Sequence, residues 1–111
     1  MIYHFCPAAA WDPTATTYVP AGFAADGFVH LSDRGTVHLP ATALHRGAHD
    51  LLLLTVDPAL VDAPLRWEPG DPADPAAPWF PHLYGPLPVR AVVRTDPWLP
   101  GPDGAFAPPS W

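Results

Sequence analysis

Proline is the residue that most limits the folds open to this chain, because the sequence contains 18 prolines and most of them follow Asp57. Proline fixes φ and has no N–H to donate, so a proline every few residues excludes long helices. The second half of the chain is therefore expected to run as short strands joined by fixed loops. A length of 111 residues is enough for one hydrophobic core but not for two, which predicts a single domain over residues 1–111.

Short segments with alternating apolar and polar residues predict a mainly antiparallel sheet. Strands are expected at Ile2–Cys6, Phe28–Ser32, Leu65–Glu68 and Val89–Thr95. The run Leu51–Leu54 does not alternate, which favours a central strand covered on both faces. One main helix is expected from Thr36 to about Arg46, with Gly47 just beyond its end. Together these patterns predict an α+β fold.

The stretch Trp79–Pro88 combines two neighbouring aromatic rings with His82, Tyr84, three prolines and a glycine. Because proline also restricts the residue before it, the pattern predicts a rigid loop. His82 and Tyr84 are two residues apart and are expected to point the same way. A stiff segment that carries a titratable ring and a phenol is typical of a binding site, although the rings could instead cover a core edge.

The net charge limits the classes of partner, and the cysteine content indicates the compartment. The five basic residues are all arginines, and 11 acidic residues give a net charge of −6, which disfavours nucleic acid and anionic membrane as partners. No targeting segment or apolar run of spanning length is evident. The only cysteine, Cys6, is expected to be buried and inert, and it fits a cytoplasmic location.

Two groups of histidines could bind a metal or a ligand. His38, His45 and His49 have near-helical spacing, but Gly47 interrupts them, so a solvated face is the simpler interpretation. His4, His30 and His82 lie in predicted strand or rigid segments and could bind zinc or the hydroxyl groups of a ligand. Because the chain has one cysteine and one glutamate, we expect no structural metal.

Glu68 is the only glutamate, and Arg66 lies two positions before it on the same predicted strand face. The two side chains could form an exposed ion pair of little energetic value. Alternatively, the Glu68 carboxylate could stabilise positive charge that develops on a ligand.

Four segments, taken in order, resemble the family called domain of unknown function 952. They are Ile2-Tyr3-His4, Gly27-Phe28-Val29-His30-Leu31-Ser32, Arg66-Trp67-Glu68 and Phe80-Pro81-His82-Leu83-Tyr84-Gly85-Pro86-Leu87-Pro88. The likeness covers nearly the whole chain. That family is in turn thought to be similar in fold to the ADP-ribosyltransferases, whose split sheets hold NAD in a cleft.

The resemblance implies a small, split, mainly antiparallel sheet and makes NAD the leading candidate ligand. Tyr3-His4 looks like the first-strand Tyr-His of that superfamily, whose histidine contacts a ribose hydroxyl. The segment from His30 to Ser32 resembles the His-Leu-Ser of the NAD-dependent RNA 2′-phosphotransferases. The chain departs from the pattern at Phe5, where a glycine is expected, and it lacks both the RNA-gripping arginines and a glutamate on the last strand.

Three functions remain open. The first is an ADP-ribosyltransferase-like enzyme that binds NAD or a related nucleotide. The second is a non-catalytic nucleotide or metabolite binding module, and the third is a pathway enzyme that performs acid and base chemistry on a small organic molecule without NAD. In each case we expect a convergent cleft. The candidate catalytic residues are His30, His82 and Glu68, and the candidate ligand-binding residues are His4, Ser32, Tyr84, Arg66 and Phe80.

Overall fold

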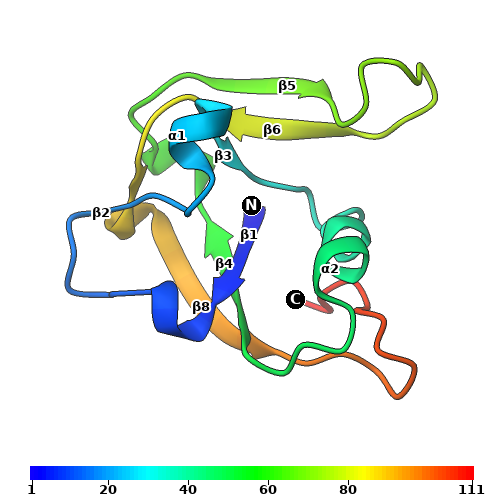
Figure 1. The fold of residues 1–111 in the computed structure, drawn as a ribbon. Coiled ribbons are helices and arrows are strands. Elements are labelled where there is room, and N and C mark those ends of the chain that lie inside the picture. The colour runs from blue at the N-terminus through cyan, green and yellow to red at the C-terminus, as the bar shows by residue number, and fades with distance from the viewer.

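The structure is a computed structural model that describes residues 1–111, and short sheets dominate it (Figure 1). The first sheet has the order β1–β4–β8 and consists of β1 (Ile2–Pro7), β4 (Leu51–Val56) and β8 (Val92–Trp98). The second has the order β3–β6–β5 and consists of β3 (Val29–His30), β6 (Trp79–Leu83) and β5 (Leu65–Pro69). A short pair joins β2 (Thr17–Tyr18) to β7 (Leu87–Pro88).

Every strand pair is antiparallel, and the longest helix is α2 (His38–His45). The predicted α+β fold with a mainly antiparallel sheet and one main helix is therefore confirmed. Pro40 lies in the first turn of α2, where its missing N–H costs nothing, and Gly47 beyond the last turn has a φ of 78°. No helix combines the length and apolar character needed to cross a bilayer.

The two larger sheets meet at one joint next to β3. The backbone N–H of Leu31 still donates to the Pro81 carbonyl of β6 at 3.0 Å. One residue later, Ser32 exchanges two backbone hydrogen bonds of 2.8 Å with Tyr3 of β1. The chain thus passes from the second sheet to the first within two residues, and the sheet is split at this point.

Strand β4 carries a core on both of its faces, as its unbroken leucine run predicted. Leu54 is fully buried in a cluster with Ile2 and Val56. Leu53 is fully buried in a second cluster with Tyr3 and Trp98 on the opposite face. Because β4 lies between β1 and β8, its backbone is also paired along both edges.

Two sequence predictions are wrong in this region of the fold. Residues 79–83 form strand β6 instead of a rigid loop, because Pro81 directs its backbone groups toward Leu31, just beyond the end of β3. Its missing N–H therefore leaves the ladder between β5 and β6 intact and removes only the return bond to the Leu31 carbonyl, beyond the end of β3. The last strand starts at Val92 and not at Val89, because Val89–Ala91 form a 3₁₀ turn, and it continues to Trp98.

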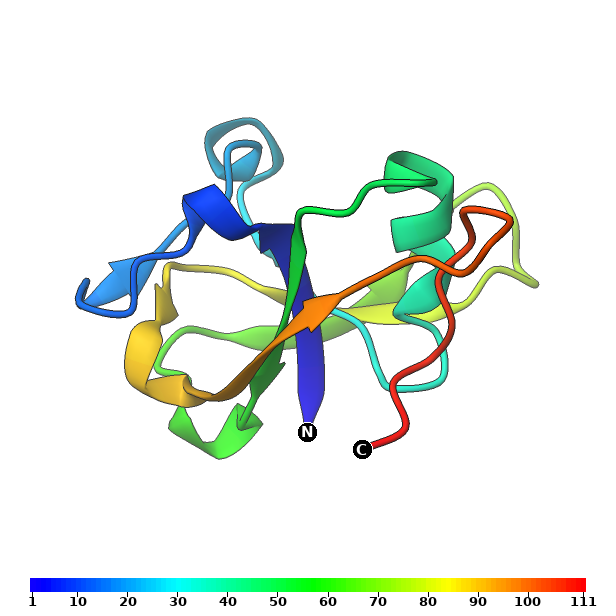
Figure 2. The same ribbon diagram turned by 90° about the horizontal axis from the view of Figure 1, so that it is seen from below.

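The two ends of the chain lie together, as Figure 2 shows. The Tyr3 hydroxyl donates to the Trp111 carbonyl at 3.2 Å. Phe106 is buried against Trp98, with 4.9 Å between the ring centroids. The proline-rich tail after β8 thus covers the face of the first sheet that carries Leu53.

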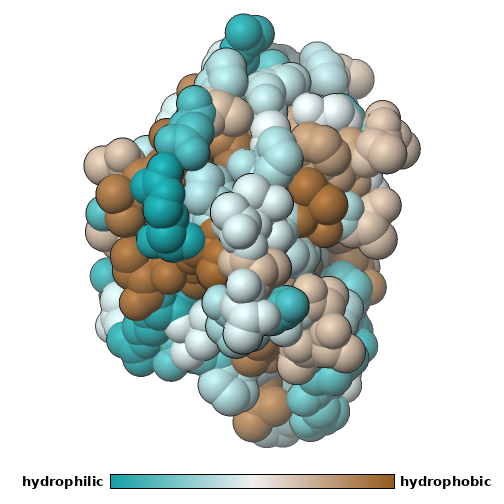
Figure 3. Space-filling view, turned by 90° about the vertical axis from the view of Figure 1, so that its left-hand side faces the viewer, coloured by the Kyte–Doolittle hydropathy of each residue, from teal (hydrophilic) through white to brown (hydrophobic).

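Large apolar side chains that reach the surface are spread over several elements. The most exposed include Leu44 at 72%, Leu99 at 60% and Trp79 at 56%. On the face drawn in Figure 3, hydrophobic residues form separate groups with hydrophilic and neutral residues between them. Exposed apolar residues of this kind are normal for a folded protein and require no partner.

Candidate functional site

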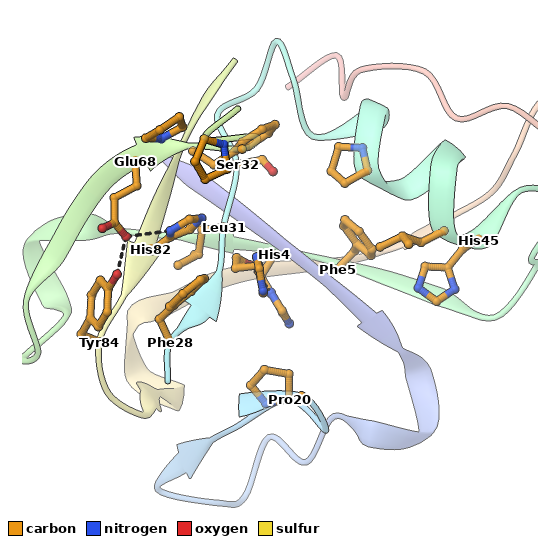
Figure 4. A pocket seen from close by; sticks show the side chains of 18 residues that line it. His4, Phe5, Pro20, Phe28, Leu31, Ser32, His45, Glu68, His82 and Tyr84 are labelled. Carbon is orange, nitrogen blue, oxygen red and sulfur yellow. Dashed lines mark hydrogen bonds and ion pairs between the residues drawn. The ribbon is translucent and has the colours of Figure 1, made fainter. Parts of the chain in front are cut away.

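A pocket of about 880 Å³ lies where the two sheets separate (Figure 4). The strands of the second sheet form one wall, β1 contributes His4 and Phe5, and α2 contributes Pro40 and Leu44 to the other side. The volume is within the usual range for small-molecule sites. The joint between Leu31 and Ser32 places both of these residues in the lining.

Seven of the eight side chains singled out from the sequence line this pocket. They are His4, His30, Ser32, Glu68, Phe80, His82 and Tyr84. Arg66, the eighth, is not part of the lining. Its guanidinium carbon lies 5.3 Å from the centre of the Tyr84 ring, and from there its charge helps to lower the pKa of Glu68.

His82 and Glu68 form a hydrogen-bonded dyad on the wall made by the second sheet. Strands β5 and β6 pair Glu68 with Phe80 and Arg66 with His82, which puts the two side chains on one face. His82 Nδ1 lies 2.8 Å from Glu68 Oε1, and since a carboxylate only accepts, Nδ1 carries the proton. His82 Nε2 has no hydrogen-bond partner in the protein and belongs to a pocket-lining residue.

Tyr84 donates its hydroxyl to the same oxygen of Glu68. This hydrogen bond is the main cause that holds the pKa of Glu68 below its usual value, and the His82 bond acts in the same direction. Glu68 in turn raises the pKa of the Tyr84 phenol, because the hydrogen bond stabilises the protonated form. The carboxylate is thus ionised and held by two donors.

Replacing Tyr84 with phenylalanine is expected to raise the pKa of Glu68, because it removes the larger of the two hydrogen bonds to the carboxylate. Glu68 is the only glutamate, so selective ¹³C labelling of glutamate gives one carboxyl signal whose pH titration needs no assignment. Tyr3→Phe, which removes a hydroxyl that bonds the Trp111 carbonyl instead, is the matched control and should leave the titration unchanged. An unchanged Glu68 titration in Tyr84→Phe would contradict the hydrogen bond.

His4 is buried and has no free ring nitrogen. Its Nδ1 donates to the His30 carbonyl at 2.6 Å, so its Nε2 accepts from the Tyr18 hydroxyl at 3.1 Å. Burial lowers the pKa of His4 to about 4, which keeps the ring neutral. His4 therefore presents a ring to the pocket and fixes the backbone of His30, and any hydrogen bond to a ligand would require breaking one of these two bonds.

His30 is the exposed member of the group. Its Nε2 lies 2.9 Å from Asp26 Oδ2, and 59% of its side chain is accessible. Its ring centre is 5.4 Å from that of His82 across the pocket wall. Asp26 ends helix α1 (Phe23–Asp26), and Gly27 at a φ of 81° turns the chain into β3.

Several residues of the site had not been selected from the sequence. Phe28 stacks on His82 with 4.0 Å between ring centres and an interplanar angle of 16°. Phe28 is two residues before His30 in the predicted strand, so the alternating pattern already placed both side chains on one face. Asp26 and Tyr18 gave no comparable signal, because helix α1 and strand β2 lie in a segment that reads as loop.

Cys6 lies outside the pocket lining and is 3% exposed. Its predicted burial is confirmed, and burial raises the pKa of its thiol. The inert character of the thiol stays a prediction. Among residues 1–111, no three His, Cys, Asp or Glu side chains are grouped closely enough to hold a metal ion. The expectation of a metal-free protein stays a prediction.

Comparison with known proteins identifies relatives over nearly the whole chain. The family model "Protein of unknown function (DUF952)" matches residues 5–95. The crystal structure of protein CC0527 from Caulobacter crescentus has a TM-score of 0.80 and 33% identity, covering 96% of this chain and 92% of that one. The solution NMR structure of CC0527 has a TM-score of 0.74 and 34% identity, covering 95% and 90% respectively. No curated protein matches.

Proposed function

From the premise that this chain belongs to the DUF952 family of proteins of unknown function, we propose that it is a small-molecule enzyme with His82 as its acid–base group. The observation that supports this most is the Glu68–His82 hydrogen bond of 2.8 Å at the wall of a pocket. The bond selects the tautomer whose Nε2 lone pair is available to a ligand. It also stabilises the imidazolium that forms when Nε2 accepts a proton.

The other side chains have supporting roles in this proposal. Glu68 orients His82, and Tyr84 holds Glu68 while Arg66 packs on the Tyr84 ring. His30 and Ser32 provide hydrogen-bonding groups at the ligand. Phe80 packs against the ligand, and His4, from its place in the lining, positions the backbone of His30.

Incubating the protein with a mixture of small metabolites in D₂O tests the proposal without knowledge of the substrate. Acid–base chemistry at His82 Nε2 exchanges the transferred proton with solvent, so mass spectrometry should find a compound that is converted or gains deuterium. His82→Gln should lose at least about a hundredfold of this rate. His49→Ala is the matched control, because His49 is exposed and lies outside the pocket lining, and it should retain the wild-type rate.

One result would contradict the role of His82, and another would contradict catalysis. Conversion that persists in His82→Gln would assign the chemistry to another group. A wild-type protein that is thermally stabilised by pocket ligands but neither converts nor deuterates any of them would instead be the non-catalytic nucleotide or metabolite binding module.

An ADP-ribosyltransferase-like enzyme that uses NAD is the second candidate. The split between the sheets supports it, because His4 and Ser32 meet there through the Tyr3–Ser32 bridge. In this alternative Ser32 would hold a ribose hydroxyl, and His4 would hold another after giving up its bond to the Tyr18 hydroxyl. Glu68 would stabilise positive charge on the ribose as nicotinamide leaves. Release of nicotinamide from NAD, abolished in Glu68→Gln, would support this candidate, and its absence would favour acid–base chemistry on another compound.

The partner in either case is proposed to be a small molecule and not a nucleic acid. The net charge of −6 supports this choice, because it repels a polyanion. A cytoplasmic location is proposed from the single, buried and unpaired cysteine, which suits a reducing compartment.

A further inference from the structure

Apart from its histidines, the charged side chains at the pocket are acidic. Glu68 is the only Asp, Glu, Lys or Arg among the 18 residues that line it. A second carboxylate, Asp26, lies 2.9 Å from the lining residue His30. The side chain of Glu68 is 36% accessible and that of Asp26 is 43% accessible. The negative charge of both carboxylates therefore acts on a ligand that enters the pocket.

Only one arginine of the chain lies near this site, and its charge already acts on Glu68. Four of the five are engaged elsewhere: Arg34 with the Pro109 carbonyl, Arg46 with the Asp103 carbonyl, Arg90 with Asp62 and Arg94 with Asp96. The fifth, Arg66, lies over the Tyr84 ring and outside the lining. The chain has no lysine, so no ammonium or guanidinium group of a side chain lines the pocket.

The walls also present several aromatic rings. Phe28 lies against His82 and is 5.2 Å from the Tyr84 ring centre. Phe5 faces the pocket from β1 (Figure 4). Phe80 of β6 also belongs to the lining. Aromatic faces attract flat rings and cations, because their quadrupole is negative above the ring plane.

We propose that this pocket takes flat-ring ligands that are uncharged or cationic, and that it discriminates against carboxylates and phosphates. The inference rests on the proposed function only in placing the ligand in this pocket. A dinucleotide carries two phosphates, so it would bind poorly in a pocket of this kind. An aryl amide or an aryl amidinium has the required combination of ring and charge.

Benzamidinium, benzamide and benzoate test the proposal directly, since they share one ring and carry charges of plus one, zero and minus one at pH 8. We expect their affinities, measured by calorimetry or NMR titration, to fall in that order. The dissociation constant of benzoate should be at least about tenfold higher than that of benzamidinium, because two nearby carboxylates repel it. Binding should perturb the NMR signals of Phe28 and His82.

Leu44→Arg provides a gain-of-function test at a lining position that is 72% exposed and outside the dyad. A cation at this rim should tighten benzoate by about threefold or more and weaken benzamidinium. Leu44→Gln removes the same apolar surface without adding charge, so it should preserve the wild-type order. Circular dichroism of both variants verifies the fold.

Benzoate binding as tightly as benzamide to the wild type would overturn the ligand class, and so would the failure of all three probes to bind at millimolar concentration. Neither result decides the acid–base proposal, which depends on the His82-dependent uptake of deuterium. Conversely, the expected charge order without any deuterium uptake would support the ligand class and leave the protein a binding module.

Discussion

Replacing Leu53 or Leu54 with alanine is expected to lower the free energy of unfolding by about 3 kcal/mol in each case. Both side chains are fully buried, and neighbouring positions on a strand point to opposite faces. Leu54→Ala leaves a cavity in the cluster that contains Val29 and Leu83, and Leu53→Ala leaves one in the cluster that contains Val37 and Trp98. Two similar losses from adjacent residues would show that β4 supports two separate cores.

Denaturant unfolding of each variant measures the effect. Leu52→Ala is the matched control within the same strand, because Leu52 is only half-buried. Its truncation should lower the free energy of unfolding by less than that of Leu53 or Leu54. Leu53→Val and Leu54→Val, with smaller expected losses, serve if an alanine variant does not fold. A loss below about 1 kcal/mol at either position would contradict the two-sided core.

Lowering the pH from 7 to 5 is expected to reduce the free energy of unfolding by about 2 kcal/mol through His4 alone. Its pKa is about 4 in the folded chain and 6.5 when unperturbed, so the unfolded chain binds the additional proton in this range. Stability must then fall as the pH drops from about 6.5 toward 4, and it is unaffected by His4 above that range. Burial is the main cause, and the Tyr18 hydroxyl occupies the nitrogen that would be protonated.

Unfolding measured at pH 5, 6 and 7 in wild type and His4→Asn isolates this contribution. Asparagine retains an N–H that can donate to the His30 carbonyl but cannot be protonated, so the variant should be less stable at pH 7 and lose most of the pH dependence. His49→Ala removes an exposed histidine and should preserve it. Equal slopes in wild type and His4→Asn would show that His4 is not held neutral by the fold.

Alternation and turn chemistry predicted most of the first sheet. Residue patterns alone predicted strand β1 and the central position of β4. Both strands pack against a core, and burial of this kind leaves a pattern of apolar residues in the sequence. The pattern failed at Trp79–Leu83, where proline content favoured a loop. Whether Pro81 interrupts a strand depends on where β3 ends, and a sequence does not contain that long-range register.

Most members of the candidate site were predictable from the sequence, but the hydrogen bonds between them were not. Residue types and the family resemblance selected His30, His82 and Glu68, all of which line one pocket. The Glu68–His82 hydrogen bond depends on the β5–β6 register, which joins residues separated by a long proline-rich loop. Likewise, nothing local indicates that Tyr18 saturates His4, since the two come from strands of different sheets.

The strand order β1–β4–β8 also has a consequence for the synthesis of the chain. Strand β1 is translated first, yet both its partners lie far downstream, with β4 beginning at Leu51 and the Ser32 bridge depending on β3 and β6. An unpaired apolar strand exposes backbone groups to other chains until its partner emerges. The first sheet cannot be completed before β8 leaves the ribosome, so pairing across the whole chain is expected to make folding slow compared with a helical protein of this length.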